Sequence, residues 1–199
     1  MERRHFPGVC FFIILILFVY GCGFTTMALH PEATVVQGQN TNYPKSIVIY
    51  DSCSGNTRLV AQVMAEKLQA PAVHVDETNE YELDGYDLMV VGSPVHGGRP
   101  TAKIKAFLSE LTPPPMSAVF VTFGAPLFGP LTANACLKNM EKELHGTSLG
   151  RFKCHGFHKI IRTYSGHPDD KDMSDAALFA EALLEKYRHA AKSAEDITD

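Results

Sequence analysis

A short polar loop carries the residues of this sequence that are best suited to bind a ligand. It follows an apolar run at residues 46–50, leads into a helical pattern and reads Asp51-Ser52-Cys53-Ser54-Gly55-Asn56-Thr57. Hydroxyl and amide side chains donate hydrogen bonds, the glycine lets a ligand approach the backbone, and the helix start adds unpaired N–H groups. An ordinary polar loop with a Ser or Thr helix cap is the alternative. Because several donors crowd into one turn, we favour a phosphate-binding loop.

The glycine pattern of this loop narrows the kind of phosphate ligand. A Walker-type loop ends in Gly-Lys-Ser or Gly-Lys-Thr, whereas Gly55 is followed here by Asn56, Thr57 and Arg58. A dinucleotide fingerprint needs three glycines, and this loop has one. The sequence therefore disfavours both ATP and a dinucleotide at this loop.

The apolar pattern predicts strands that alternate with helices. The strand candidates are short apolar runs at residues 46–50, 72–75, 87–92, 117–123 and 151–157. Helical spacing of apolar residues predicts helices from Thr57 to before Pro71, around 104–111, around 137–144, and from about Asp172 onwards. This alternation predicts an α/β fold, a doubly wound five-stranded parallel sheet in three layers (α/β/α). Ligands of such sheets bind at the carboxyl ends of the strands, which is where the polar loop falls.

At the polar loop the sequence resembles the flavodoxin family. The family signature asks for two aliphatic residues, an aromatic residue, a Ser or Thr, a small residue and a Thr at fixed spacing, with an Ala further on. The chain meets it with Ala61 and with Val48-Ile49-Tyr50-Asp51-Ser52-Cys53-Ser54-Gly55-Asn56-Thr57. In the family this loop holds the 5′-phosphate of noncovalently bound FMN. The resemblance therefore implies FMN as the cofactor, with its phosphate at Ser52, Cys53, Ser54, Gly55, Asn56 and Thr57.

Two further loops are similar to those that border the flavin in the family, and the resemblance covers roughly residues 45–190. The loops lie at 92–100 and 122–129, and they imply the site residues Ser93, Pro94, Val95, His96, Gly97, Gly98, Phe123, Gly124 and Phe128. His96 stands where many relatives have Tyr or Trp, which implies that it stacks on the flavin. Its imidazole is a smaller platform and can take up a proton near neutral pH. A solvent-exposed loop histidine is the alternative.

Other chemistries fit the sequence less well. Low-molecular-weight phosphatases have a Cys-x₅-Arg loop, whereas Cys53 and Arg58 have Cys-x₄-Arg spacing, so we interpret Cys53 as a neutral loop residue. No Ser-His-Asp arrangement can be argued from the sequence, and no catalytic residue is predicted. A metal site is not predicted either, because the sequence lacks a helical His-x-x-x-His pair. We interpret the remaining candidates as surface or flavin-rim groups: His155, His158, His167 and Asp169.

The resemblance implies an FMN-binding electron carrier that passes electrons between redox partner proteins. Short loops favour a carrier, because a reductase usually adds segments or a dimer partner to build a nicotinamide or quinone pocket. An FMN-dependent NAD(P)H:quinone-type oxidoreductase is the alternative. A phosphatase-like hydrolase and a flavin-free lipoprotein domain are less favoured.

The composition is that of a soluble globular domain, with 199 residues, 45% hydrophobic and 20% charged. A net charge of -4 and a pI of about 6.1 predict no broad basic face, so nucleic acid is not an expected partner. The five cysteines include no Cys-x-x-Cys pair, which disfavours a zinc ribbon or thioredoxin-type chemistry.

The beginning of the chain has basic, apolar and polar regions in the order that is typical of a signal or membrane anchor. Arg3 and Arg4 precede an apolar run at residues 10–20, which fits a signal h-region of ~7–15 residues and is shorter than the ~20 of a spanning helix. Val19-Tyr20-Gly21-Cys22 resembles a bacterial lipobox, which implies lipidation at Cys22. We predict an anchor at 1–22, a polar linker at 23–44, the domain at 45–190 and a tail at 191–199. The domain is then membrane-associated on the extracytoplasmic side. The alternative is a cytoplasmic protein that starts near Tyr43.

Overall fold

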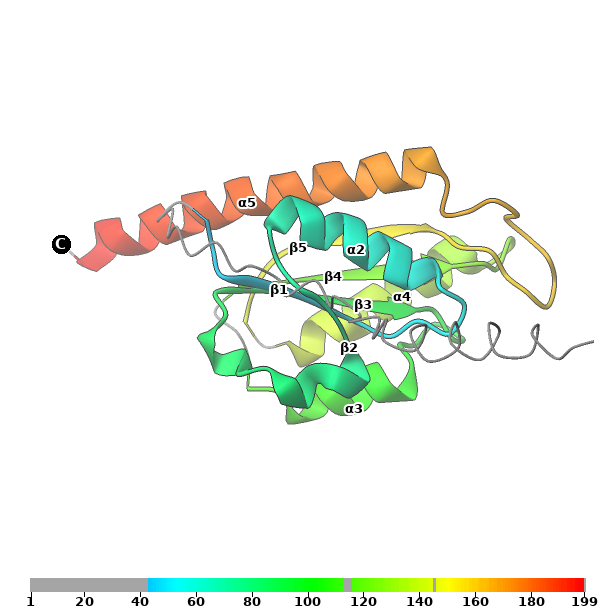
Figure 1. Cartoon of the computed structure of the whole chain (residues 1–199), viewed down its shortest axis with the longest axis horizontal. Helices are drawn as coiled ribbons and strands as arrows, with labels where there is room; N and C mark the ends of the chain where they lie inside the picture. The colour runs from blue at the N-terminus through cyan, green and yellow to red at the C-terminus, as the bar shows by residue number, and fades with distance from the viewer. Residues whose placement is uncertain (1–42, 113–115, 145, 199) are drawn as a thin grey trace, which may run out of the picture. The chain divides into compact units, whose positions relative to one another are not determined.

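The computed structural model describes residues 43–112, 116–144 and 146–198, in which strands and helices alternate (Figure 1). The strands are β1 (Ser46–Tyr50), β2 (Ala72–His74), β3 (Leu88–Pro94), β4 (Met116–Phe123) and β5 (Thr147–His155). The helices are α2 (Asn56–Leu68), α3 (Ala102–Glu110), α4 (Gly129–Glu143) and α5 (Asp170–Thr198). The short 3₁₀ helices η1 (Val75–Glu80) and η2 (Leu83–Gly85) connect β2 to β3.

The strands form one parallel sheet in the order β2-β1-β3-β4-β5. In the central pairing Val48 of β1 lies opposite Val90 of β3, and Val90 lies opposite Ala118 of β4. After β2 the chain crosses back over β1, so the strand order reverses between β1 and β3. The predicted fold class, a doubly wound five-stranded parallel sheet, is confirmed.

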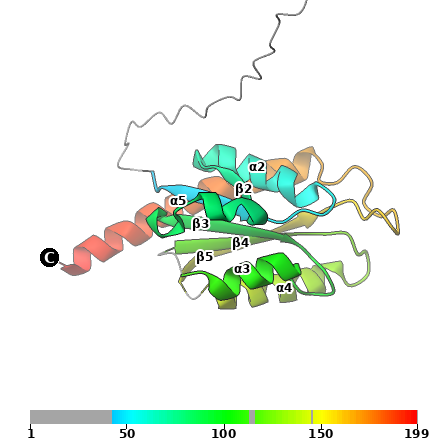
Figure 2. The same ribbon diagram turned by 60° about the horizontal axis from the view of Figure 1, so that its bottom comes forward.

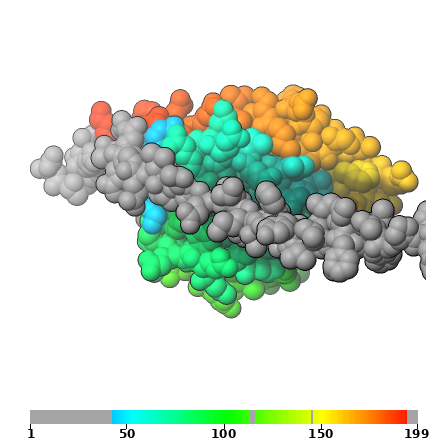
Figure 3. Space-filling view, viewed as in Figure 1, coloured from blue at the N-terminus to red at the C-terminus, as the bar shows by residue number. Residues whose placement is uncertain are grey.

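Helices cover both faces of the sheet, as Figures 1 and 2 show. Successive side chains of a strand point to opposite faces, so Val48 of β1 packs in one apolar core with α2 and α5, while Ile49 packs in the other with α3 and α4. Figure 3 shows α2 and α5 side by side on one surface of the molecule. The two cores hold the strands rigidly and leave their carboxyl ends to carry the loops of the site.

The edge strand β5 differs from its prediction, since it covers 147–155 rather than 151–157. Only one of its faces packs against a core, through Leu149 and Cys154. On the other face Arg151 lies 3.6 Å from Glu141, and Lys153 donates to Asn134, both on α4. This mixed pattern lacks the continuous apolar run by which the inner strands were recognised. The residues 156 and 157 therefore belong to the loop that follows the strand.

The predicted anchor at 1–22 and the linker up to residue 42 lie outside the described residues. Among the helices described, none combines the length and the apolarity needed to cross a membrane. At the other end, α5 continues to Thr198, beyond the predicted end of the domain at residue 190.

Candidate functional site

The loops that follow β1, β3, β4 and β5 meet at the carboxyl edge of the sheet. Ligands of doubly wound sheets bind at this edge, where the strand order reverses. The reversal falls between β1 and β3 here, so the 51–55 loop and the 95–101 loop flank it. The topology therefore places the predicted phosphate loop at the expected position.

Gly55 makes the sharp entry into α2. Its φ of 93° is in the left-handed region, which glycine adopts without steric cost, and it is the N-cap residue of the helix. No described side chain caps the helix from that position, and the first turn contains no acidic residue. The start of α2 therefore has the partial positive charge and open N–H groups that attract an anion.

Two serine hydroxyls of this loop are arranged as donors toward a ligand. The Oγ of Ser52 accepts a hydrogen bond from the backbone N–H of Arg58 at 3.2 Å. The Oγ of Ser54 accepts one from Nδ2 of Asn56 at 3.0 Å. A hydroxyl has one proton to give, and neither bond uses it. Both serines can therefore donate to a phosphate without losing their contacts to the protein.

Long-range hydrogen bonds fix the loop to the rest of the edge. Oγ1 of Thr57 lies 2.9 Å from Oγ1 of Thr122 near the end of β4, and both side chains are buried. Asn56 also donates from Nδ2 to the carbonyl of Phe157, 101 residues away, at 3.0 Å. The phosphate loop is thereby held against the loops after β4 and β5.

Beside the phosphate loop lies a cavity of about 310 Å³, within the usual range for small-molecule sites. Eight of the predicted site residues line it: Cys53, Ser54, Asn56, Pro94, Val95, His96, Phe123 and Gly124. A neighbouring hollow of about 440 Å³ shares Cys53 and Ser54 and adds the predicted Ser52 and Gly55. The walls of the cavity are mostly apolar, whereas the hollow is polar. This division fits a ligand whose flat apolar part lies in the cavity and whose phosphate lies in the hollow.

The other predicted site residues lie outside both spaces. Ser93 is fully buried, and its hydroxyl donates to the carbonyl of Pro94 while accepting from the N–H of Thr101. Thr57 lies beneath the phosphate loop, and Phe128 is 66% exposed at the start of α4. Gly97 and Gly98 form a tight turn with φ angles of 58° and 82°.

That turn sets the position of His96. The N–H of His96 donates to the carbonyl of Arg99 at 2.9 Å, and the reverse bond measures 3.1 Å. Two residues with positive φ between such a pair are typical of a tight hairpin turn, and glycine suits both positions. His96 is therefore held at the rim of the cavity, where its exposed imidazole can contact a bound ring.

The loop after β5 supplies further cavity residues: Gly156, Phe157, His158, Lys159 and Ile160. Of these, the sequence indicated only His158, which was interpreted as a surface or flavin-rim group. A Cβ on Gly124 would lie 2.6 Å from Cβ of His158 and 2.9 Å from the carbonyl oxygen of Gly156. Glycine at 124 thus allows the loops after β4 and β5 to touch. The local sequence carries no motif for this contact. The only indication was the general rule that the loops after all strands of a parallel sheet lie at the same edge.

The charges at this edge are unevenly distributed. The stretches 93–100, 122–131 and 156–166 contain no Asp or Glu, while Arg99, Lys159 and Arg162 are exposed there. On the β2 side, Asp51 lies 3.3 Å from His74, and Glu77 lines the polar hollow. Burial raises the pKa of the Tyr50 phenol beside that hollow, so this side chain remains neutral. The cavity itself is therefore lined without a carboxylate.

The described cysteines are free thiols with different surroundings. Cys53 is exposed at the cavity, whereas Cys136 and Cys154 are buried. Burial raises the pKa of Cys136 to about 12. Burial, with the carboxylates of Asp172, Asp169 and Asp175, also raises the pKa of Cys154. Both buried thiols therefore stay protonated and serve packing.

A bigger hollow, of about 530 Å³, lies away from these loops, between η1, η2 and the end of α3. Its lining includes Glu82, Asp84 and Glu110 and no basic residue. This acidic lining suits a phosphate poorly, so the site is placed at the carboxyl edge of the sheet.

The comparisons with known proteins agree on one family. A family model described as a flavodoxin domain matches residues 47–166. An uncharacterised protein of Methanocaldococcus jannaschii is 28% identical over 70% of this chain and 98% of that protein. A flavodoxin of Aquifex aeolicus is 36% identical over 34% of this chain, and the match covers 40% of that protein. The structure of oxidised flavodoxin 2 from Bacillus cereus has a TM-score of 0.56 at 23% identity, covering 71% of this chain and 99% of that one. Since the domain match spans more than half of the sequence, the chain belongs to the flavodoxin family.

Proposed function

We propose that the protein binds FMN noncovalently and carries electrons between redox partner proteins. The observation that carries this proposal is the pair Ser52 and Ser54 at the start of α2, whose hydroxyls accept bonds from the protein and keep their protons for a ligand. Bound FMN would supply reversible one- and two-electron chemistry. Membership of the flavodoxin family supports the choice of FMN.

The chain's own residues would divide the work of binding. Ser52, Ser54 and the first backbone N–H groups of α2 would hold the phosphate with charge-assisted hydrogen bonds. Val95 and Phe123 would enclose the flat apolar part and exclude water, since both line the cavity. His96 would cover the ring at the exposed rim. One edge of a flavin held in this way remains open to a partner.

The shape of the loops favours a carrier over a reductase. The 51–55 and 124–128 loops span only the step from a strand to the next helix. The 95–101 loop is two residues longer, and the longest segment at this edge, 156–169, folds back so that the N–H of Phe157 donates to the carbonyl of His167. These loops leave little material to build a second pocket for nicotinamide or quinone. The partners would instead be proteins that approach the cavity mouth.

The test is an anaerobic reductive titration of the full purified chain after loading with FMN. Stoichiometric FMN, reduction by dithionite in two resolved one-electron steps, and no reduction by NADPH alone are expected for a carrier. Rapid reduction by NADPH with turnover of a quinone would contradict the carrier proposal. A folded chain that takes up no FMN would contradict flavin binding itself.

We further propose that residues 1–22 attach the domain to a membrane. The basic start, the apolar run and the lipobox-like Val19-Tyr20-Gly21-Cys22 support this proposal. Attachment would confine the electron carrier to partners at the same surface.

A further inference from the structure

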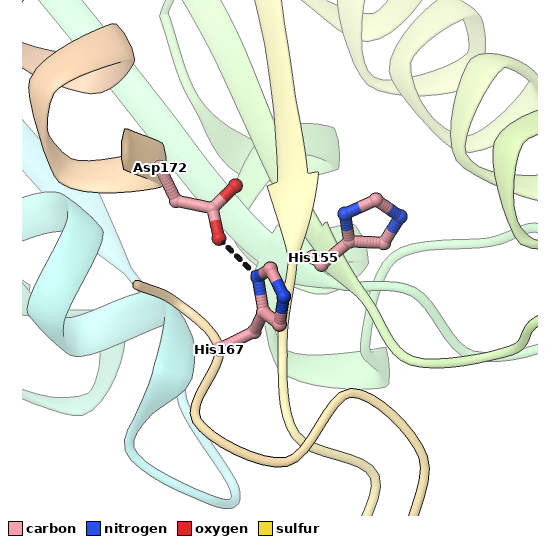
Figure 4. Close-up of side chains that lie close together, drawn as sticks. All are labelled: His155, His167 and Asp172. Carbon is pink, nitrogen blue, oxygen red and sulfur yellow. Dashed lines mark hydrogen bonds and ion pairs between the residues drawn. The ribbon is translucent and has the colours of Figure 1, made fainter. Parts of the chain in front are cut away.

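A cluster of metal-ligating side chains lies next to the cavity. His155 ends β5, His167 lies in the following loop, and Asp172 is in the first turn of α5 (Figure 4). One potential ligand atom of each residue lies within 4.8 Å of the others. These residues are 12 and 5 positions apart in the sequence, and only the return of the chain from β5 to α5 brings them together.

We propose that His155, His167 and Asp172 bind a divalent transition-metal ion of the Zn²⁺ class. Ions of this class bind well to a set of two imidazoles and one carboxylate. Mg²⁺ and Ca²⁺ instead take mainly oxygen ligands. The site goes beyond flavin binding, since none of the three side chains lines the cavity.

The distances between the potential ligand atoms can be compared with those around a bound ion. Tetrahedral Zn²⁺ with bonds of about 2.1 Å places its ligand atoms about 3.4 Å apart. Nδ1 of His167 lies 2.5 Å from Oδ2 of Asp172 and 3.7 Å from Oδ2 of Asp169. Opening the first pair by less than 1 Å would admit the ion (an order-of-magnitude movement from the same bond lengths). Asp169 lies near enough to provide a fourth ligand.

The surroundings orient these ligands. The N–H of Asp169 donates to Oδ2 of Asp172, and the N–H of Asp172 donates to Oδ1 of Asp169. The latter bond holds the pKa of Asp169 below its ordinary value, which keeps this carboxylate charged. The ring of Tyr164 stacks on His155 with 4.1 Å between centroids. Outer contacts of this kind fix the orientation of ligands and raise metal affinity.

The cluster is accessible to an ion from solvent. The side chain of His167 is 28% exposed and that of Asp172 is 13% exposed. The neighbouring Cys154 is buried and does not belong to the cluster. A metal here would join β5, the 156–169 loop and α5. Because this loop supplies Phe157 and His158 to the cavity, the ion would stiffen one wall of the flavin site.

Zinc titration tests the proposal directly. The full chain is produced without a polyhistidine tag, stripped with a chelator and titrated with Zn²⁺ by calorimetry, in the presence and absence of FMN. We expect one site per chain that is lost in His155→Ala and His167→Ala, each lowering affinity by more than about 100-fold. The matched controls are His189→Ala and Asp175→Asn, which change the same residue types on α5 outside the cluster. Absence of a stoichiometric site, or equal losses in the controls, would overturn it.

A second measurement does not depend on how well these variants fold. Lys159 and Arg162 are exposed trypsin sites in the 156–169 loop. Zn²⁺ should slow cleavage after both residues in the wild-type chain by at least several-fold, without changing cleavage of an unrelated substrate by the same trypsin. Equal cleavage rates with and without Zn²⁺ would contradict a metal that ties this loop. Because both tests use the FMN-free chain as well, failure of flavin binding would leave their outcome readable.

Discussion

Thr57 of α2 and Thr122 of β4 share a buried hydrogen bond of 2.9 Å between their Oγ1 atoms, although 65 residues separate them in the sequence. The bond joins the phosphate loop to the strand that ends at Phe123 and is followed by Gly124. Either hydroxyl can be the donor. The bond ties the phosphate loop to β4 whichever of the two hydroxyls donates.

Replacing Thr57 by Val keeps the shape of the side chain but leaves the buried Thr122 hydroxyl without this partner. An unpaired buried polar group costs about 1–3 kcal/mol, so the free energy of unfolding should fall by that amount in the FMN-free chain. Thr57→Ser retains the hydroxyl and should lose less. Urea unfolding measures both values, and equal losses would mean that the hydrogen bond contributes nothing.

Replacing Gly124 by Ala should push apart the loops after β4 and β5. The added Cβ would lie 2.6 Å from Cβ of His158, and overpacking of this kind costs about 1–3 kcal/mol. Gly85→Ala is the matched control, because its nearest atom is the flexible Nζ of Lys45 at 3.0 Å. Thermal unfolding and FMN affinity should both worsen only in Gly124→Ala. A loss of the same size in Gly85→Ala would contradict a specific contact.

His96 should couple the redox potential of bound FMN to pH. A positive group about 4–6 Å from the ring favours its negatively charged, fully reduced form by roughly 1 kcal/mol at high effective dielectric, or about 40 mV for one electron. A positive charge on the imidazole of His96 should therefore raise the potential of the second reduction step by this extra amount.

His96→Phe should remove the extra rise while keeping an aromatic ring at the rim. His189→Phe on α5 is the control and should retain it. The measurement is the midpoint potential against pH for the three proteins. An identical pH dependence in His96→Phe would show that His96 points away from the flavin.

Cys22→Ser should release the protein from the membrane fraction or leave its first residues uncleaved, because a lipobox cysteine is the site of lipidation. Cys10→Ser changes the other cysteine of the predicted anchor at 1–22 and should leave attachment unchanged. Fractionation with sequencing of the mature N-terminus separates these outcomes. A soluble protein that begins near Tyr43 would contradict the predicted anchor.

The sequence predicted the sheet because its inner strands are continuous apolar runs, as at residues 46–50 and 87–92. The phosphate loop was predictable for a local reason, since its donors are consecutive residues. The cavity wall after β5 was not, because Gly156 and Phe157 reach Asn56 only through tertiary packing. The interpretation of His155 and His167 as separate surface or rim groups missed their approach for the same reason. The spacing of these histidines along the chain does not indicate their approach, because that approach depends on where β5 ends.

The central claim is that the loop at 51–57 holds the phosphate of FMN. The most direct measurement compares the affinities of FMN and riboflavin in wild type, Ser52→Ala and Ser54→Ala, by quenching of flavin fluorescence. Hydrogen bonds to a charged group are worth about 1.5–3 kcal/mol, so each variant should weaken FMN by about 10- to 150-fold and riboflavin far less. Equal losses for FMN and riboflavin would contradict the claim.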